Sequence, residues 1–423
     1  MDMLDRFLGK LIKDGELILI DASGRERRFG RDDGSGGRVK LRLADRKVVM
    51  DVLRQPKVAI GEAYMDGRLI LEEGDILALL DLVTANAPWE RGGRARKAIA
   101  RGGRKLASRL ALINGRRRSR RNVAHHYDLS DRLYDLFLDS DRQYSCAYFT
   151  DPASSLERAQ ADKKAHIAAK LHLKPGQKVL DIGCGWGGTA LYLHRVADVD
   201  VLGITLSEEQ LAVARRRAQE EGVADRVKFE LLDYRDVEGP FDRIVSVGMF
   251  EHVGQPRYRQ FFAKCRELLA QDGVMLLHTI GRMGGPGAPN KWTDKYIFPG
   301  YYVPALSEMV AASEQVKLIA ADVEMLRLHY AYTLEHWYDR VQAHKAEIVA
   351  LYDERFFRMW EFYLAYTIVG FRHGGMINYQ IQYIRDRRAL PITRDYMTAD
   401  EARLRQRAGG ESRSAPARAM PAS

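Results

Sequence analysis

The sequence has few cysteines and no long apolar run, and these two gaps exclude several classes of protein. Its 423 residues include three cysteines, Cys146, Cys184 and Cys265, with no CxxC pair. A disulfide framework or a zinc ribbon needs paired cysteines, so we expect a reducing, cytoplasmic compartment and no metal site. The neighbouring His125 and His126 do not alter this expectation, because nothing else in the sequence supports a metal. The longest apolar runs, such as IVSVGMF, are far too short to cross a bilayer.

The N-terminal stretch MDMLDRFLGKLIKDG also lacks the features of a secretory signal. It contains acidic residues and has no long apolar core followed by a cleavage site. Its apolar residues instead repeat at helical spacing as far as Ile12, and Gly15 is a plausible stop. We therefore expect a helix here.

Acidic residues are absent from one window of the chain. Residues 91–121 contain thirteen Lys or Arg and no Asp or Glu, so that the net charge of +10 would be −3 without them. Such a segment binds a polyanion, either nucleic acid or an anionic membrane surface, or it is a solvated linker with no partner. Aromatic residues do not interleave with these arginines, which weakens the case for single-stranded nucleic acid.

The pattern of apolar residues and glycines divides the chain into four regions. Residues 1–88 predict a small α+β domain, and residues 89–121 form a basic linker. Residues 122–407 repeat the order strand, glycine turn, helix, which predicts a catalytic domain built on a parallel, doubly wound α/β sheet. Residues 408–423 are small, polar and Pro-containing, and we expect a disordered tail.

Within these regions, specific runs of residues predict the individual elements. In the N-terminal domain we expect strands at 15–20, 39–45 and 46–53 and a helix after Gly74. In the catalytic domain, apolar runs predict the strands 178–185, 199–206, 227–234, 241–250 and 273–280.

A glycine-rich loop follows the first strand of the predicted catalytic sheet. VLDIGCGWGG contains Gly183, Gly185, Gly187 and Gly188 between a strand and a helix, where the backbone can approach a ligand closely. A dinucleotide fingerprint needs its third glycine one residue later and an acid closing the second strand. The second strand ends GITLSEEQ instead, and Asp233 closes the third, where it can accept an adenine amino group. The loop therefore predicts a nucleoside cofactor on a Rossmann-like sheet.

At this level of detail the chain resembles a known family, the cyclopropane-fatty-acyl-phospholipid synthases, which use S-adenosylmethionine. The matching stretches span nearly the whole chain in order: GEAYMDGRL (61–69), HYDLSD (126–131), QYSCAYF (143–149), LDIGCGWGG (180–188), GITLSEEQ (203–210), RIVSVGMFEHVG (243–254), LLHTIG (276–281) and KYIFPG (295–300). The resemblance implies a class I methyltransferase sheet. GEAYMDG resembles the N-terminal lipid-associated domain of the phospholipid-acting branch, which favours phospholipid over mycolate.

The resemblance also implies two sets of site residues. The implied cofactor contacts are Tyr144, Ser145, Gly183, Gly185, Thr205, Leu206, Gln210, Asp233, Tyr234 and Arg235. The family also binds a bicarbonate ion, and its implied ligands are Cys146, Glu251, His278, the backbone of Ile280, and Tyr330. In this interpretation Cys146 is one wall of an anion pocket and not a nucleophile, while Cys184 and Cys265 are structural.

The implied reaction adds a methylene to a cis double bond of an acyl chain through a carbocation. Aromatic faces stabilise such a cation, and the segment 291–302 has five aromatic residues that are either lining residues or a packed loop. The resemblance further implies a homodimer. Because no segment is long and apolar enough to enter the bilayer, we expect the basic linker to dock the enzyme on the anionic inner face of the cell membrane, and we expect no nucleic-acid partner. The alternatives are methylation or methylenation without ring closure, a small-amine N-methyltransferase, an RNA-modifying enzyme, and a non-enzymatic lipid-surface protein.

Overall fold

The computed structural model of the chain describes residues 2–31, 34, 37–92 and 129–410. The predicted basic linker therefore lies outside the described residues from 93 onward. His125 and His126 and the last thirteen residues of the predicted tail lie outside them as well.

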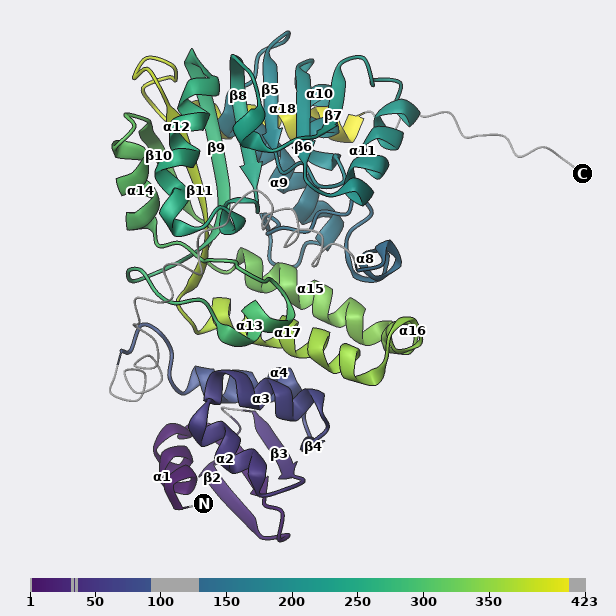
Figure 1. The fold of residues 1–423 in the computed structure, drawn as a ribbon, viewed down its shortest axis with the longest axis vertical. Coiled ribbons are helices and arrows are strands. Elements are labelled where there is room, and N and C mark those ends of the chain that lie inside the picture. Colours follow the sequence, from purple (N-terminus) through teal and green to yellow (C-terminus); the bar gives the residue numbers. More distant parts are fainter. Residues whose placement is uncertain (1, 32–33, 35–36, 93–128, 411–423) are drawn as a thin grey trace, which may run out of the picture.

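A seven-stranded sheet forms the centre of the catalytic domain (Figure 1). Its strand order is β10 (Ile319–Met325), β11 (Met376–Ile384), β9 (Leu269–Arg282), β8 (Phe241–Val247), β5 (Lys178–Ile182), β6 (Asp200–Thr205) and β7 (Val227–Leu231). The five strands that the sequence predicts run parallel, whereas β11 pairs antiparallel with both β9 and β10. Apart from the two strands β10 and β11, which the sequence did not predict, this sheet confirms the expected α/β fold.

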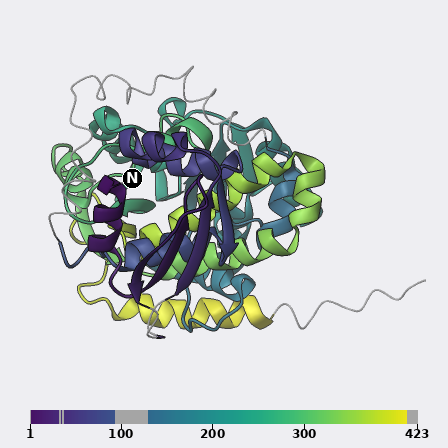
Figure 2. The ribbon, with the colours of Figure 1, turned by 90° about the horizontal axis from the view of Figure 1, so that it is seen from below.

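Consecutive residues of a strand point to opposite faces of the sheet, and here both faces carry apolar residues, so helices cover both. Leu180, Ile244 and Met275 are buried on the face covered by α12 (Tyr258–Leu268) and α14 (Leu306–Glu314). Val179 and Val245 are buried on the other face. That face is covered by α9 (Leu156–Leu171), α10 (Gly188–Ala197), α11 (Glu208–Glu220) and α18 (Asp395–Gly410). Figure 2 shows α18 lying along one side of the molecule.

A layer of helices lies between the sheet and the N-terminal domain (Figure 1). It consists of α8 (Asp131–Phe137), α13 (Lys291–Tyr296), α15 (His329–Ala343), α16 (Lys345–Leu351) and α17 (Glu354–Arg372). Ile280, near the C-terminal end of β9, packs into the core of this layer, so the ligand-binding edge of the sheet faces these helices.

The N-terminal domain is a four-stranded sheet with four helices. Its elements are α1 (Asp2–Leu11), β1 (Gly15–Ile20), β2 (Glu26–Arg31), β3 (Arg38–Leu43), α2 (Lys47–Arg54), α3 (Pro56–Met65), β4 (Leu69–Glu73) and α4 (Ile76–Ala85). The strand order is β2-β1-β3-β4, with β1 and β3 parallel and both outer pairs antiparallel.

The N-terminal domain contacts the helical layer through α3 and α4. Glu62 accepts hydrogen bonds from Lys295 Nζ at 2.6 Å and from Tyr296 Oη at 2.7 Å. Arg355 Nε of α17 donates to Asp66 Oδ1 at 2.9 Å. The GEAYMDG motif therefore forms part of the interface between the two domains.

Two sequence predictions about local structure need correction. Residues 46–53 were expected to be a strand, but they form α2 because Val48, Val49, Val52 and Leu53 recur at helical spacing and pack inward together. At the C-terminus, α18 continues to Gly410, three residues into the predicted tail.

Candidate active site

A cavity of about 120 Å³ lies at the C-terminal ends of β5, β6, β7 and β8. Eight of the ten predicted cofactor residues line it: Gly183, Gly185, Thr205, Leu206, Gln210, Asp233, Tyr234 and Arg235. They lie at or just after the C-terminal ends of three strands, β5, β6 and β7, which the parallel sheet brings to one edge. The remaining two, Tyr144 and Ser145, are not among the lining residues.

The glycine loop passes close to the loop after β8. The N–H groups of Gly183 and Cys184 donate to the carbonyl of Ile204 at 2.9 and 3.0 Å, which ties the loop to β6. Gly183 has a φ of 84°, and a Cβ there would lie 2.9 Å from Met249 Cβ. Only glycine fits this conformation and approach without strain. The loop ends at Gly188, where the first turn of α10 begins and favours a negatively charged group.

Hydrogen bonds already orient the polar residues of the cavity. Thr205 Oγ1 donates to Gln210 Oε1 at 3.1 Å. Arg235 Nε donates to Asp233 Oδ1 at 2.7 Å, and its guanidinium lies over the Tyr234 ring at 5.5 Å from the centroid. The backbone N–H of Arg235 also donates to Asp233 Oδ1, at 3.1 Å, which fixes the carboxylate at the end of β7.

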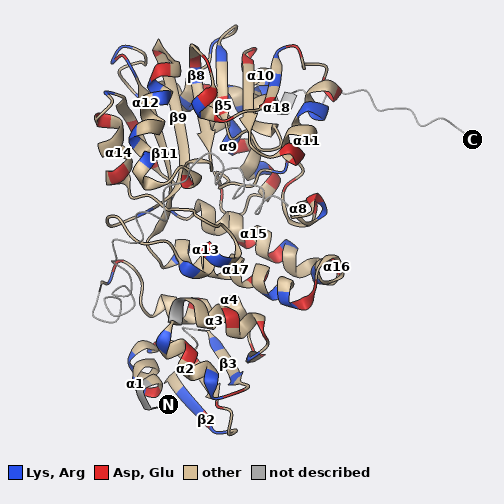
Figure 3. Cartoon of the chain, viewed as in Figure 1, with Lys and Arg blue, Asp and Glu red and all other residues tan. Residues whose placement is uncertain are grey.

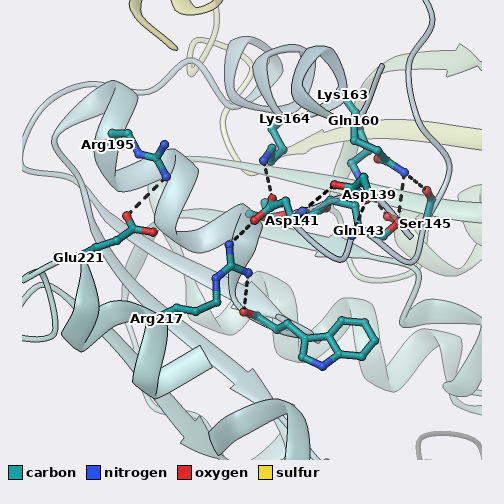
Figure 4. Close-up of polar contacts among 12 residues, drawn as sticks. Asp139, Asp141, Gln143, Ser145, Gln160, Lys163, Lys164, Arg195, Arg217 and Glu221 are labelled. Carbon is teal, nitrogen blue, oxygen red and sulfur yellow. Dashed lines mark hydrogen bonds and ion pairs between the residues drawn. The ribbon is translucent and has the colours of Figure 1, made fainter. Parts of the chain in front are cut away.

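Tyr144 and Ser145 lie in the segment that joins α8 to α9. Tyr144 Oη is 3.4 Å from Tyr363 Oη, and its ring packs against Trp337 with centroids 5.2 Å apart. Ser145 Oγ accepts a hydrogen bond from Lys163 Nζ at 2.8 Å (Figure 4). These contacts hold Tyr144 within the packed helical layer and tie Ser145 to α9.

The loop after β8 contributes lining residues that the sequence did not single out. Met249, His252, Val253 and Arg257 all face the cavity. Burial lowers the pKa of His252 to about 4, so this imidazole is neutral at neutral pH. The sequence contained a signal for them, because these residues lie in or just after the stretch GMFEHVG, which begins in the last residues of a predicted strand.

Glu251 occupies the same loop but points away from the cavity toward β9. Its Oε1 accepts a hydrogen bond from the N–H of Ile280 at 2.6 Å. Its Oε2 is buried and has no hydrogen-bond partner in the described part of the chain. Burial raises the pKa of Glu251 to about 7, although the Ile280 N–H opposes this rise. The carboxyl group can therefore gain or lose a proton near neutral pH.

His278 lies two residues before Ile280 on the same strand and is buried, with one side-chain amide against each ring nitrogen. Gln380 Oε1 accepts from Lys170 Nζ at 2.8 Å, which leaves Gln380 Nε2 to donate to His278 Nδ1 at 3.1 Å. The side-chain amide of Asn378 lies 2.9 Å from Nε2. Burial lowers the pKa of His278 well below its usual value. The ring is thus neutral.

Cys146 and Tyr330 pack in the core of the helical layer together with Ile280. Cys146 is 1% exposed, and burial raises the pKa of its thiol, so it is not a thiolate at neutral pH. Tyr330 packs against Phe371, with ring centroids 4.9 Å apart. Of the predicted bicarbonate ligands, Glu251 and Ile280 are joined by a hydrogen bond.

These residues fit a small anion in some respects. The unpartnered Oε2 of Glu251, when protonated, is a donor, and the buried Lys163 places positive charge near His278 and Cys146. The N–H of Ile280 is used by Glu251, so an anion at this backbone group would share it with that carboxyl.

The aromatic segment 291–302 separates into packed and site-facing residues. Trp292 is buried beside Gly61, and the hydroxyls of Tyr296 and Tyr302 donate to Glu62 and Glu308. Phe298 instead lies with its ring centroid 6.0 Å from that of the cavity residue His252. Most of the segment is therefore a packed loop, and Phe298 is the residue beside the site.

Comparison with known proteins places this geometry in a family. The family profile described as mycolic acid cyclopropane synthetase matches residues 114–381. The chain is 38% identical to the cyclopropane-fatty-acyl-phospholipid synthase of Escherichia coli (strain K12) over 334 residues, or 79% of this chain and 85% of that protein. It is 42% identical to a probable fatty acid methyltransferase of Pseudomonas putida over 287 residues, or 65% of this chain and 73% of that one.

A solved structure agrees with the sequence relatives. The structure of mycolic acid cyclopropane synthase CmaA1 in complex with SAH and CTAB matches with a TM-score of 0.60 and 35% identity, over 62% of this chain and 97% of that one. The family and its cofactor support S-adenosylmethionine-dependent transfer of a one-carbon group to a lipid double bond. The chain therefore belongs to the cyclopropane synthase family of S-adenosylmethionine-dependent enzymes.

Proposed function

We propose that this enzyme adds a methylene to a cis double bond of an unsaturated phospholipid acyl chain and closes a cyclopropane ring. The observation that carries the proposal is that the loop after β8 faces both the cofactor cavity and strand β9. Met249, His252 and Val253 face the cofactor cavity, while Glu251 between them presents a titratable, partly unpartnered carboxyl to β9. A proton acceptor therefore lies next to the cofactor site.

When bound, S-adenosylmethionine supplies an electrophilic methyl group to the weakly nucleophilic alkene. Water would trap the acyl cation as an alcohol, so the site must be dry. Cys146, Ile297 and Tyr363 belong to the buried core of the helical layer that faces this edge of the sheet, which would exclude water. Phe298 and Tyr363, whose ring centroids are 6.0 Å apart, offer aromatic faces to that cation. A desolvated cation–π contact is worth on the order of 2 kcal/mol.

Ring closure requires loss of a proton from the transferred carbon. Cys146, Glu251, His278, the backbone of Ile280, and Tyr330 would hold bicarbonate, which would supply the base at this position. Glu251 Oε2 is suited to take the proton onward, because its pKa of about 7 makes proton uptake and release nearly balanced. The neutral His278 is held in one orientation by its two amide neighbours and can orient the anion.

The N-terminal domain and the linker support a phospholipid in a membrane surface as the substrate. The match to CmaA1 covers 97% of that protein but 62% of this chain, so more than a third of this chain lies beyond a mycolate-type enzyme. No helix among the described residues is both long and apolar enough to span a bilayer. A peripheral enzyme on the inner face of the cell membrane, acting as a homodimer, is consistent with this composition.

An assay of the purified protein with S-adenosylmethionine and vesicles of cis-unsaturated anionic phospholipid tests the proposal. We expect the acyl chains to gain one CH₂, to lose their vinyl proton signals and to show new upfield ring protons by NMR. Sedimentation analysis of the same sample reports whether the enzyme is a dimer.

A second candidate function is methylation or methylenation of the same double bond without ring closure. It is favoured by the 42% identity to the Pseudomonas putida protein named as a probable fatty acid methyltransferase. Both reactions pass through the same acyl cation, so the site geometry serves either. A gained carbon with an olefin or a saturated methyl branch in the product would select this candidate. If no carbon from S-adenosylmethionine appears in the lipid, both candidate functions are rejected.

A further inference from the structure

Lys163 of α9 is a fully buried lysine that the reaction described above does not use. Its side chain donates to two neutral acceptors, Gln143 Oε1 and Ser145 Oγ, each at 2.8 Å (Figure 4). No carboxylate of the described residues forms an ion pair with it, whereas the neighbouring Lys164 pairs with Asp141, and Lys170 pairs with Glu324. A buried charge without a counter-charge costs several kcal/mol.

The acidic groups around Lys163, Asp139 and Asp141, attract its charge from a distance but form no direct ion pair with it in the described residues. Asp139 accepts backbone hydrogen bonds from Asp141 at 3.1 Å and from Gln143 at 2.9 Å. Asp141 is occupied by Lys164 and by Arg217 of α11. These two acids raise the pKa of Lys163, but burial dominates and lowers it to about 8. Lys163 is therefore still charged at neutral pH.

The positive charge of Lys163 acts on the predicted anion site. Apart from Lys164 on its own helix, the other titratable groups near it are Cys146 of the segment before α9 and His278 of β9. Lys163 opposes the rise in the pKa of Cys146 and adds to the lowering of the pKa of His278. Its charge thus lies beside two of the residues expected to hold an anion.

The hydrogen bond to Ser145 has a fixed direction. An ammonium group has donors only, so Ser145 Oγ must accept from Lys163 and must direct its own O–H elsewhere. The carbonyl of Ser145 is held in turn by Gln160 Nε2 at 3.0 Å. The serine hydroxyl is therefore committed as a donor toward an acceptor outside the Lys163 contact.

We propose that Lys163 is a positioning residue that supplies the counter-charge for a carboxylate-type anion at the reaction centre and presents Ser145 Oγ–H to it. The anion is either the carboxylate of the bound cofactor or bicarbonate, which share this chemistry. The inference rests on the proposed function, in which Cys146, the residue next to Ser145, holds the anion. It does not depend on whether the product contains a ring.

Binding measurements test the proposal and distinguish the two anions. Three probes are applied to the wild-type protein and to the variants Lys163→Met and Lys163→Arg. Two probes are nucleosides, whose binding is measured by calorimetry: S-adenosylhomocysteine has the carboxylate, and 5′-methylthioadenosine lacks it. The third probe is sodium bicarbonate, whose binding is detected as a shift in the thermal unfolding temperature. If the cofactor carboxylate is the partner, Lys163→Met weakens S-adenosylhomocysteine about 10–100-fold and leaves 5′-methylthioadenosine unchanged. If bicarbonate is the partner, Lys163→Met abolishes the bicarbonate-induced shift alone.

The pH dependence of binding separates a counter-charge from a packing role. In wild type the affinity for S-adenosylhomocysteine should fall as the pH rises above 8, because Lys163 loses its proton. Lys163→Arg should keep the affinity but lose this fall, because arginine does not titrate in this range. Lys164→Met is the matched control. It removes a positive charge from the next residue of the helix, whose side chain contacts Asp141 and not Ser145, so this variant should keep the wild-type pH dependence.

Two results would overturn the proposal. One is a folded Lys163→Met variant that binds both anions as wild type does. The other is a fall in affinity above pH 8 that persists in Lys163→Arg, because another group would then be titrating. Each readout is a binding measurement, so it stands apart from the lipid assay. A product without a cyclopropane ring in the lipid assay would reject ring closure but would leave the proposed role of Lys163 standing.

Discussion

Burial decides the protonation state of each residue expected to act at this site. The thiol of Cys146 and the imidazole of His278 are both kept neutral, because neither charged form is solvated in the core. Glu251 differs from them because its pKa of about 7 leaves both forms accessible. At the residue scale, Glu251 is therefore the group whose state changes under working conditions.

Glu251→Gln should lower kcat/KM by about 10²–10⁴-fold, the usual contribution of a general acid or base. In wild type, kcat/KM should rise about tenfold per pH unit below pH 7 and level off above it, because Glu251 becomes deprotonated in this range. The variant should lack this inflection. The measurement is the pH profile of label transfer from S-adenosylmethionine into lipid.

Thermal unfolding shows whether the Glu251→Gln variant is intact. The pKa of Glu251 is higher in the folded chain than in the unfolded chain, so wild-type stability should fall as pH rises from 4.5 through 7. The glutamine variant should escape this loss and be the more stable protein at pH 8. Cys146→Ser is the matched comparison within the site, and we expect it to retain most activity because a hydroxyl also donates. An inactive Cys146→Ser variant that still binds cofactor would indicate a covalent role for the thiol.

Helix α3 shows how one short element connects the two domains. Its motif GEAYMDG brings Gly61 against Trp292 of α13 and Phe362 of α17, where a Cβ would lie 2.5 Å from Trp292 Nε1. Glu62 bonds to α13 in the next position. The element that the sequence associated with lipid is thus also a packing surface for the aromatic segment beside the active site.

Gly61→Ala should destabilise the protein by about 1–3 kcal/mol, since the added methyl group overlaps large buried rings that cannot move freely. Gly9→Ala in α1 is a matched control in the same domain, because its nearest neighbour, Phe29 Cδ1, would be 4.0 Å away. Alanine should stabilise that helix by about 0.5–1 kcal/mol. Urea unfolding of both variants measures the difference, and equal effects would contradict the packing argument.

At the scale of the whole molecule, charge is unevenly distributed. Lys and Arg are prominent on β2 and β3 of the N-terminal domain (Figure 3), but several are paired there, such as Arg42 with Glu72 and Arg38 with Glu73. The window 91–121 has thirteen basic residues and no acid to pair with them locally. The linker is therefore the stronger candidate for contact with an anionic surface.

Binding to anionic vesicles should weaken steeply between about 50 and 300 mM salt, because screening reduces surface attraction. Each well-placed Lys or Arg contributes roughly 1 kcal/mol at such a surface. Replacing Arg116, Arg117 and Arg118 together with glutamine should lower vesicle affinity at low salt while leaving S-adenosylhomocysteine binding unchanged. Co-sedimentation with vesicles measures this, and equal binding to neutral and anionic vesicles would exclude the role.

The sequence by itself determined the features that depend on local periodicity and turn chemistry. The five parallel strands, the glycine loop after β5 and the closing Asp233 are encoded within a few residues each, and parallel strands must bring their C-terminal ends to one edge. For this reason eight of the ten expected cofactor residues line a single cavity. The remaining assignments to ligands stay predictions.

Only the tertiary structure decided the contacts between distant segments. The antiparallel strand β11, the hydrogen bond from Ile280 to Glu251, and the unpaired Lys163 beside His278 each join residues that are at least 29 positions apart. No local pattern specifies which buried charge will lack a partner, because that depends on which side chains the packed core brings together. The folding of the helical layer onto the sheet therefore set the protonation states on which the chemistry depends.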